Sequence, residues 1–303
     1  MSLLSRLKAP QANGFGYGST ANDVTRDLDL SSHTILLTGC AAGLGRETLL
    51  ALAARGAKLI ATARSEAQAR EACSGVASQA IPLACDLANP SSVRACVAAV
   101  RQRAPQLDAI ICNAGIMAPP KLLQAYGYEL QFFTNHVGHF LLVTGLLDRL
   151  AEHGRVVMVS SNAHRRPPRE GIQFDNLSGD AGYEPFQMYG QSKLANLLFS
   201  SELARRLPQG QSSNALHPGV IATSLGRSSP VWVRTALQVL TPLALKSPAQ
   251  GAATQCYVAV HPGMQGTGRY FVDCNPKPPS ALGSDPELAR RLWEVSERIV
   301  SGL

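Results

Sequence analysis

Short apolar runs alternate with longer stretches of helical periodicity along most of the chain. Residues 1–33 precede this alternation and form a glycine- and serine-rich N-terminal extension. The apolar runs predict about seven strands, at 34–38, 58–62, 80–85, 108–112, 155–159, 212–216 and 268–272. Helical periodicity predicts helices between them, including 43–55, much of 126–150, 187–207 and a polar segment at the C-terminal end.

The predicted strands are apolar throughout, which indicates burial on both faces, as parallel sheets require. The helices between them supply the right-handed crossovers that parallel strands need. We therefore predict an α/β fold with one Rossmann-type, doubly wound parallel sheet and helices on both faces. Because no repeat or linker interrupts the pattern, residues 34–303 are expected to form a single cofactor-binding and catalytic domain.

Composition and charge narrow the range of partners. Of the 303 residues, 45% are hydrophobic and 16% charged, so a sizeable core is expected and disorder is not. The net charge of +7 permits an acidic partner, and an anionic cofactor would use part of it. The basic residues are scattered except in 164–169, which we interpret as a solvated loop rather than a nucleic-acid patch. No nucleic-acid partner is predicted.

The cysteines and the apolar segments bear on location. The seven cysteines form no CxxC pair and no metal-ligand spacing, so we predict reduced thiols, no metal site and a cytoplasmic location. Residues 1–18 lack the apolar core of a signal peptide. The longest apolar stretch, 231–245, is interrupted by Arg234, Gln238 and Pro242, so no membrane span is predicted.

A glycine-rich turn joins the first predicted strand to the helix after it. Gly39, Gly43 and Gly45 allow a tight turn, a close approach to a pyrophosphate and close packing of the helix on the strand. The following helix offers its N-terminus to an anion. Glycines also simply make turns, but a strand before and a helix after favour a dinucleotide site. A Walker-type loop is excluded because Leu44 replaces its second glycine.

The end of the second predicted strand distinguishes the two nicotinamide cofactors. An acidic residue there would bind the ribose 2′-hydroxyl of NAD. Here Arg64 follows the strand instead and can bind a 2′-phosphate, with Arg46 as a second donor. Arg64 can also be an ordinary surface arginine, but we predict NADP(H), that is NADP or its reduced form NADPH, as the cofactor.

Further motifs follow strand ends in a fixed order. They are Asn113-Ala114-Gly115 after the fourth predicted strand, Ser160-Ser161 after the fifth, and Tyr189-Gly190-Gln191-Ser192-Lys193 at the start of a long helix. With the glycine turn, this set resembles the short-chain dehydrogenase/reductase family over nearly the whole chain.

Longer stretches resemble the retinol-dehydrogenase-like branch of that family. They are Asn135-His136-Val137-Gly138-His139-Phe140, residues 189–199, His217-Pro218-Gly219 and Tyr270-Phe271-Val272-Asp273-Cys274. The N-terminal Gly14-Phe15-Gly16 is similar to plant chloroplast-envelope and bacterial members. Positions 41 and 42 depart from the pattern, because both are alanine where relatives commonly carry polar or basic residues. This removes one partner for a phosphate.

The resemblance implies roles for individual residues. The catalytic set is Tyr189, Lys193, Ser161 and Asn135, with Ser160 as the fallback for Ser161. The cofactor set is Gly39, Ala42, Gly43, Leu44, Gly45, Arg46, Arg64, Asp86, Leu87, Asn113, Ala114, Gly115, Tyr189, Lys193, Pro218, Gly219, Val220 and Thr223. Within it, Asp86 is expected near the adenine, Gly115 near the ribose and Gly219 near the nicotinamide amide. Asn135 is expected to hold a water that links Lys193 to solvent, or alternatively to be a helix-kink residue bonded to backbone.

Proton transfer explains why these residue types suit the chemistry. Reduction of a carbonyl by hydride leaves an alkoxide that must take a proton, and the ordinary pKa of tyrosine, about 10, is too high for easy transfer at neutral pH. Tyr189 and Lys193 are four residues apart and share one face of a helix. The Lys193 ammonium is therefore expected to lower the pKa of Tyr189, and by resemblance it also binds the ribose. Ser161 is expected to hydrogen-bond the substrate oxygen.

Three histidines near these motifs have simpler interpretations. His136 and His139 lack a third ligand, so we interpret them as packed helix histidines rather than a metal pair. His164 is close enough to Ser161 in sequence to reach a substrate, but an exposed loop histidine is the preferred interpretation.

The combined prediction is an NADP(H)-dependent carbonyl reductase or dehydrogenase acting on a small hydrophobic aldehyde, ketone or alcohol. The apolar segment 224–247 is interpreted as a lid over that substrate, although its residues can also simply pack on the core. Two alternatives stay open: an NADP(H)-sensing binding protein, and a reductase of an activated C=C bond. The sequence leaves a homo-oligomer open as well.

Overall fold

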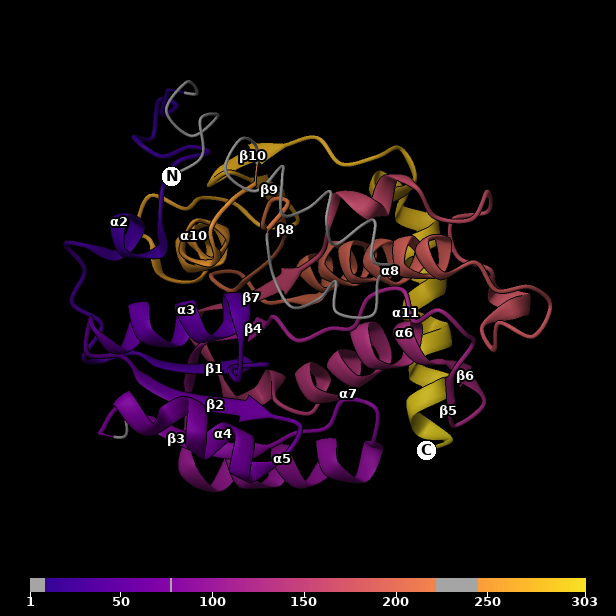
Figure 1. Cartoon of the computed structure of the whole chain (residues 1–303), viewed down its shortest axis with the longest axis horizontal. Helices are drawn as coiled ribbons and strands as arrows, with labels where there is room; N and C mark the ends of the chain where they lie inside the picture. The colour runs from indigo at the N-terminus through magenta and orange to yellow at the C-terminus, as the bar shows by residue number, and fades with distance from the viewer. Residues whose placement is uncertain (1–8, 77, 222–244) are drawn as a thin grey trace.

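The computed structural model describes residues 9–76, 78–221 and 245–303 (Figure 1). One sheet of eight strands dominates it. In sheet order these are β10 (Asn275–Lys277), β9 (Tyr270–Val272), β8 (Ser212–His217), β7 (Leu150–Val159), β4 (Leu107–Cys112), β1 (Thr34–Thr38), β2 (Lys58–Ala63) and β3 (Ala80–Ala84). Neighbouring strands are parallel except for the antiparallel pair β9 and β10. The prediction of a Rossmann-type parallel sheet is confirmed.

The sheet has one strand more than the prediction of about seven. The additional strand is β10, at the edge of the sheet, and Pro276 in its middle has no N–H to donate. A separate hairpin of β5 (Gln124–Ala125) and β6 (Tyr128–Glu129) was also not predicted. Each of these strands has only two or three residues, too few to show a periodicity.

Helices connect the strands and cover the sheet. They are α2 (Ala21–Thr25), α3 (Gly43–Ala53), α4 (Glu66–Cys73), α5 (Pro90–Arg103), α6 (Leu130–Phe132), α7 (Gly138–Thr144), α8 (Pro185–Arg206), α10 (Pro248–Val260) and α11 (Pro286–Ser301). Between α6 and α7 the chain forms one π-helical turn (Phe133–Val137). The segment predicted as helical over much of 126–150 therefore contains a hairpin strand and a widened turn as well as regular helix.

Alternate residues of each strand point to opposite faces of the sheet, and each face has its own core. On one face, Leu36 and Val156 pack with residues of α5, α7, α8 and α11. On the other face, Ile35 and Val157 pack with residues of α2, α3, α4 and α10. The helices therefore cover both faces, as predicted for a doubly wound sheet.

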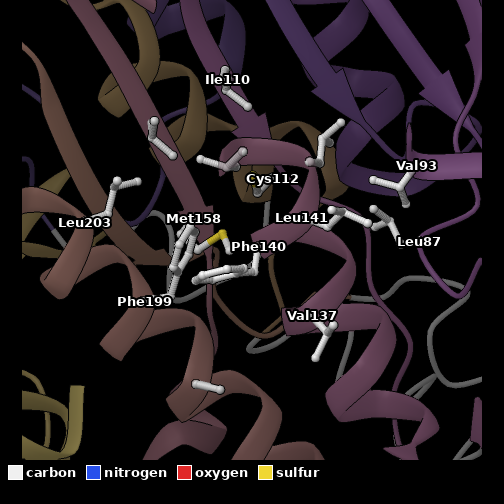
Figure 2. Packing of buried hydrophobic residues seen from close by; sticks show 14 of the residues in the cluster. Leu87, Val93, Ile110, Cys112, Val137, Phe140, Leu141, Met158, Phe199 and Leu203 are labelled. Carbon is white, nitrogen blue, oxygen red and sulfur yellow. The ribbon is translucent and has the colours of Figure 1, made fainter. Parts of the chain in front are cut away.

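The C-terminal helix α11 is held by an aromatic cluster. It crosses α8, as the yellow helix in Figure 1 shows. The Trp293 ring stacks on Phe199 of α8 at 5.6 Å and meets the edge of Phe140 of α7 at 5.0 Å between centroids. Figure 2 shows Met158 of β7 pointing toward the rings of Phe140 and Phe199. These contacts fix the position of α8, which carries the predicted catalytic motif.

The described part of the N-terminal extension packs on α10. A capping box starts its short helix α2, where the Thr20 hydroxyl accepts from the Asp23 N–H and the Asp23 carboxylate accepts from the Thr20 N–H. Phe15 lies against the rings of Tyr257 and His261 of α10. The described part of the extension is therefore packed on the fold.

Three further findings bear on the predictions from composition. All seven cysteines are buried, unpaired thiols. Among the described residues, no group of three or more histidine, cysteine or acidic side chains is arranged to hold a metal ion. None of the described helices combines the length and the apolarity that crossing a bilayer requires.

Candidate active site

The candidate residues gather at one edge of the sheet. Seven neighbouring strands run parallel, so their C-terminal ends meet at that edge. The segments that leave these ends begin with Gly39 after β1, Arg64 after β2, Asn113 after β4, Ser160 after β7 and Pro218 after β8. In open α/β sheets, ligands bind at this edge, where the strand order reverses on either side of the first strand.

The glycine turn has the backbone that the sequence predicts. Gly39 and Gly43 have φ of +73° and +56°, values that side chains disfavour. A Cβ on Gly45 would overlap the Gly39 carbonyl oxygen and lie 2.7 Å from Asn113 Nδ2. Ala42 is the N-cap of α3 and provides no side-chain acceptor, so the first N–H groups of α3 remain available to an anion.

A hydrogen-bond network holds this turn to β4. The Asn113 side chain donates to the carbonyl oxygens of Thr38 at 2.8 Å and Gly39 at 3.2 Å. The backbone N–H groups of Asn113 and Ala114 donate to the Thr38 hydroxyl at 2.9 and 3.0 Å. Asn113 therefore fixes the turn itself, a role that the sequence did not reveal.

His139 extends the network to the helix that carries Asn135. Burial lowers the pKa of His139 to about 4, so its ring is neutral. Its Nδ1 faces the Asn135 carbonyl oxygen at 2.9 Å and must donate, which leaves Nε2 to accept from the Thr38 hydroxyl at 2.9 Å. The interpretation as a packed helix histidine holds, and the same is true of the buried His136. The sequence did not reveal the hydrogen bond between His139 and Thr38, because the two residues lie 101 positions apart.

The start of α8 places Tyr189 and Lys193 at the same edge. Glu184 caps the helix by accepting from the Gln187 N–H, and Pro185 occupies its first turn. Tyr189 then lies one turn before Lys193, whose Nζ is 5.7 Å from the centre of the Tyr189 ring. The Lys193 side chain is buried and donates to the Val159 carbonyl oxygen at 3.0 Å.

Burial controls the proton affinities of this pair. It raises the pKa of Tyr189 to about 12, while a hydrogen bond with the Ser161 hydroxyl opposes the shift. It lowers the pKa of Lys193 to about 8. The expectation of a Tyr189 pKa below its ordinary value is therefore wrong for this structure, because the net shift is upward. The ammonium lies beside the ring, bonded to Val159, and the loss of hydration on burial dominates.

The two serines after β7 point in different directions. Ser160 is buried, and its hydroxyl donates to the Lys193 carbonyl oxygen at 2.7 Å. Ser161 is partly exposed and faces the Tyr189 hydroxyl. Its own carbonyl oxygen accepts from His164 Nδ1 at 2.7 Å. Of the two serines, Ser161 is the one that can contact a molecule bound beside Tyr189.

His164 is a correction to the sequence analysis. It is fully buried rather than exposed, because its ring packs edge-on against Tyr270 at 4.9 Å and its Nε2 accepts from the Ser280 N–H at 3.2 Å. His164 therefore connects the turn after Ser161 to the segment that contains Ser280.

Asn135 lies in the π-helical turn, fully buried. Its side chain accepts from the Ile116 N–H at 2.8 Å and donates to the Ile116 carbonyl oxygen and the Ser192 hydroxyl. It thus holds the strand-end segment that contains Gly115, and a Cβ on Gly115 would lie 3.0 Å from Asn135 Oδ1 and 3.4 Å from Lys193 Nζ. Asn135 is therefore bonded to backbone in a widened helical turn, which was one of its two interpretations. Its amide oxygen and Lys193 Nζ also lie on the same side of Gly115.

The predicted adenine-side residues lie at the ends of β2 and β3 and, for Arg46, in the first turn of α3. Arg64 and Arg46 are exposed, and within the described part of the chain neither guanidinium has a hydrogen-bond or ion-pair partner. Asp86 is partly buried and accepts from the Ala88 N–H. Leu87 belongs to the core, and its carbonyl oxygen packs on Gly138 so closely that a Cβ there would overlap it.

The segment after β8 completes the edge. Pro218 is buried, Gly219 has a φ of +99°, and Val220 is exposed. The Ile221 side chain packs on Gly251 of α10, and a Cβ on Gly251 would lie 2.5 Å from Leu44 Cδ2. The segment therefore packs beside the glycine turn. Thr223 and the predicted lid, apart from 245–247, lie outside the described residues.

These features fit a dinucleotide. The glycine turn and the uncapped start of α3 suit a pyrophosphate, and the side-chain-free Gly115 beside Lys193 suits a ribose. Arg64, which has no partner among the described residues, suits a phosphate.

Comparison with known proteins places the chain among related sequences. A family model described as short chain dehydrogenase matches residues 33–233. The chain is 39% identical over 308 residues to the chloroplastic short-chain dehydrogenase TIC 32 B of Brassica napus, covering 96% of each chain. It is 38% identical to human retinol dehydrogenase 14, covering 88% of this chain and 86% of that one. A crystal structure of an uncharacterised Mycobacterium paratuberculosis protein superposes with a TM-score of 0.75 at 32% identity, covering 93% of this chain and 97% of that one.

Proposed function

The chain belongs to the short-chain dehydrogenase family of nicotinamide-dependent oxidoreductases, and from this premise we propose that it is an NADP(H)-dependent enzyme. It transfers a hydride between the nicotinamide and a hydrophobic aldehyde, ketone or alcohol. The observation that carries the proposal is the Tyr189 hydroxyl, which has Ser161 as its hydrogen-bond partner and Lys193 one helical turn away. We also propose that residues 34–303 form one domain.

The preference for NADP rests on the end of β2. Arg64 replaces the acidic residue that would bind an NAD ribose, and its exposed guanidinium is available for a phosphate. Arg46 in the first turn of α3 is a second cation on the same cofactor half. Alanine at positions 41 and 42 leaves the phosphate to these two arginines.

Tyr189 would act as the general acid in the reducing direction. A bound nicotinamide supplies the hydride. Tyr189 gives its hydroxyl proton to the carbonyl oxygen, and its raised pKa keeps it a neutral phenol, and so a donor, at neutral pH. Ser161 donates a hydrogen bond to the same oxygen and aligns it. The Lys193 ammonium binds the ribose and stabilises the phenolate that the proton transfer leaves behind.

Two exposed apolar side chains at the edge of the sheet that carries Tyr189 are consistent with an apolar substrate. Phe186 in the first turn of α8, one turn before Tyr189, leaves 57% of its surface exposed, and Val220, in the segment after β8, leaves 58% exposed. Large exposed apolar side chains at the edge that carries a reactive group favour a hydrophobic ligand. One relative is named a retinol dehydrogenase, and a retinoid-like alcohol or aldehyde is a reasonable member of the test panel. A cytoplasmic location remains our prediction.

The experiment combines binding with turnover. Purified protein is titrated with NADPH by fluorescence, and NADPH oxidation is followed with a panel of aldehydes and ketones of increasing length. Tyr189→Phe should lower turnover on the best substrate by about 10²–10⁴ and leave NADPH affinity nearly unchanged, since it removes only the proton donor.

Tyr257→Phe is the matched control. It deletes a tyrosine hydroxyl from α10, where the hydroxyl donates to the Gly263 carbonyl oxygen, on the opposite face of the sheet from α8. Full activity of Tyr189→Phe would refute the assignment. Tight NADPH binding with no turnover of any substrate would instead favour a sensor.

A further inference from the structure

A buried lysine outside the proposed catalytic set packs directly on the segment after β8. Lys246 is 1% exposed, and a Cβ on Gly219 would lie 2.6 Å from its Cδ and 3.1 Å from its Cε. Its backbone N–H donates to the Val220 carbonyl oxygen at 3.0 Å, and Lys246 pairs with Ile221 in a parallel β-bridge. The positions of residues 219–221 therefore depend on where this lysine lies.

The ammonium of Lys246 is held from two distant parts of the chain. Its Nζ lies 2.5 Å from Asp273 Oδ1, in the turn between β9 and β10. It also lies 4.9 Å from the centre of the Tyr17 ring, in the N-terminal extension. A buried charge is costly unless it is paired, and Asp273 and the Tyr17 ring offset that cost here.

Both partners are fixed by hydrogen bonds of their own. Asp273 has a φ of +54°, and its carbonyl oxygen accepts from Asn275 Nδ2 at 2.6 Å. On either side of Tyr17, the Phe15 carbonyl oxygen accepts from Asn275 Nδ2 at 3.2 Å and the Gly18 carbonyl oxygen accepts from Gln250 Nε2 at 3.2 Å. Lys246 therefore lies between Asp273 and Tyr17, and hydrogen bonds hold the backbone at or beside each of these residues.

His217 connects this cluster to the proposed catalytic serine. Its Nδ1 accepts from the backbone N–H of Asn162, next to Ser161, at 3.2 Å. Acceptance requires a neutral ring, and burial, with help from the Lys246 ammonium and against Asp273, lowers the pKa of His217 to about 4. The strand end before Gly219 is therefore tied to the turn that carries Ser161.

We propose that the Lys246–Asp273 ion pair, with the Tyr17 ring against its ammonium, is a positioning device for residues 218–221 at the nicotinamide end of the cofactor site. Through Tyr17, the N-terminal extension becomes part of that site. The inference rests on the proposed function, which assigns residues 218–221 to the nicotinamide amide. Lys246, Asp273 and Tyr17 are positioning residues and need not touch the cofactor.

The test compares two ligands that share the adenosine 2′-phosphate half of the site. NADPH reaches residues 218–221, and 2′,5′-ADP does not. Lys246→Met and Asp273→Asn should each weaken NADPH binding by about tenfold or more and leave the dissociation constant of 2′,5′-ADP unchanged. Tyr17→Leu should act in the same direction. Because Lys246 and Asp273 contact each other, their effects should not be additive. The double variant of Lys246→Met and Asp273→Asn should therefore lose less affinity for NADPH than the sum of the two single losses.

Controls separate this role from general stability. Lys277→Met makes the same change at an exposed lysine of β10 and should alter neither dissociation constant. If Lys246→Met does not fold, Asp273→Asn keeps the test, since its carboxylate is 20% exposed and the substitution preserves size. If these variants lost affinity for NADPH and 2′,5′-ADP equally, or for neither, this inference would be overturned and the proposed function would stand. Failure of the unaltered protein to bind NADPH would overturn the proposed function and this inference with it.

Discussion

Replacement of Arg64 by aspartate tests the proposed cofactor preference most directly. Arg64 follows the last residue of β2, is exposed, and has no hydrogen-bond or ion-pair partner within the described residues. The substitution therefore breaks no contact seen in the structure, and the change in stability should stay within about 0.5 kcal/mol, as for other surface positions. Any larger effect on cofactor affinity then reports on the ligand.

The expected magnitude follows from the chemistry of the lost contact. A hydrogen bond between charged groups contributes about 1.5–3 kcal/mol, which corresponds to roughly tenfold to a hundredfold in the dissociation constant. Arg64→Asp should weaken NADPH binding by this factor or more, since the new carboxylate also repels the 2′-phosphate. NADH affinity should hold or improve, because an acidic residue at this place can accept from the ribose 2′-hydroxyl.

The assay is a fluorescence titration of each protein with NADPH and with NADH in the same buffer, at one salt concentration. Arg103→Asp is the matched control, because Arg103 is an exposed arginine at the C-terminal end of α5. This helix leads into the N-terminal end of β4, whereas Arg64 follows the C-terminal end of β2. It changes the net charge equally and should shift neither constant by more than a small factor. Equal affinities of the unaltered protein for both cofactors would refute the reasoning, as would a parallel loss of both in Arg64→Asp.

Three further predictions follow from the site and the core. Burial lowers the pKa of Lys193 to about 8, so the ammonium is present below that pH and lost above it. The value of kcat/KM should therefore fall as the pH rises through about 8, and a flat pH profile would contradict a role for the charge. Gly45→Ala should abolish NADPH binding in titrations, because its Cβ would overlap the Gly39 carbonyl oxygen; unchanged affinity would show that the turn can relax. Trp293→Ala removes the ring stacked on Phe199 and should lower the free energy of unfolding by about 3–5 kcal/mol in denaturant titrations, whereas a loss below 1 kcal/mol would mean that α11 is not held by this cluster.

Much of the fold could be predicted because its signals are local. Residues 35–37 and 109–112 are apolar on both faces of their strands, and burial on both faces is what a central parallel strand needs. The motifs at the ends of these strands then had to meet at one edge. The same logic could not find β10, whose Pro276 and short length carry no periodic signal.

The contacts within the site could not be predicted, since they depend on tertiary packing. The expectation for the pKa of Tyr189 considered only the neighbouring charge and omitted the burial that raises it. His164 was expected to be exposed because its sequence neighbours are polar, but Tyr270 and Ser280 cover it from more than a hundred positions away. Asp273 lay in a stretch that carries the family resemblance and Lys246 in the segment interpreted as a lid, but neither was given a role from the sequence, and only their juxtaposition makes them a candidate.

The docking of the N-terminal extension has a consequence for folding kinetics. The Asn13 side chain donates to the Cys274 carbonyl oxygen across 261 positions of the chain. Closing so long a loop costs only about 0.6 kcal/mol more than closing one of half the length, so the equilibrium penalty is small. Contacts this distant nevertheless form late, after local helices and neighbouring strand pairs. A chain diluted out of denaturant should therefore recover its helical circular dichroism first, and its affinity for NADPH only once both ends of the sequence have met.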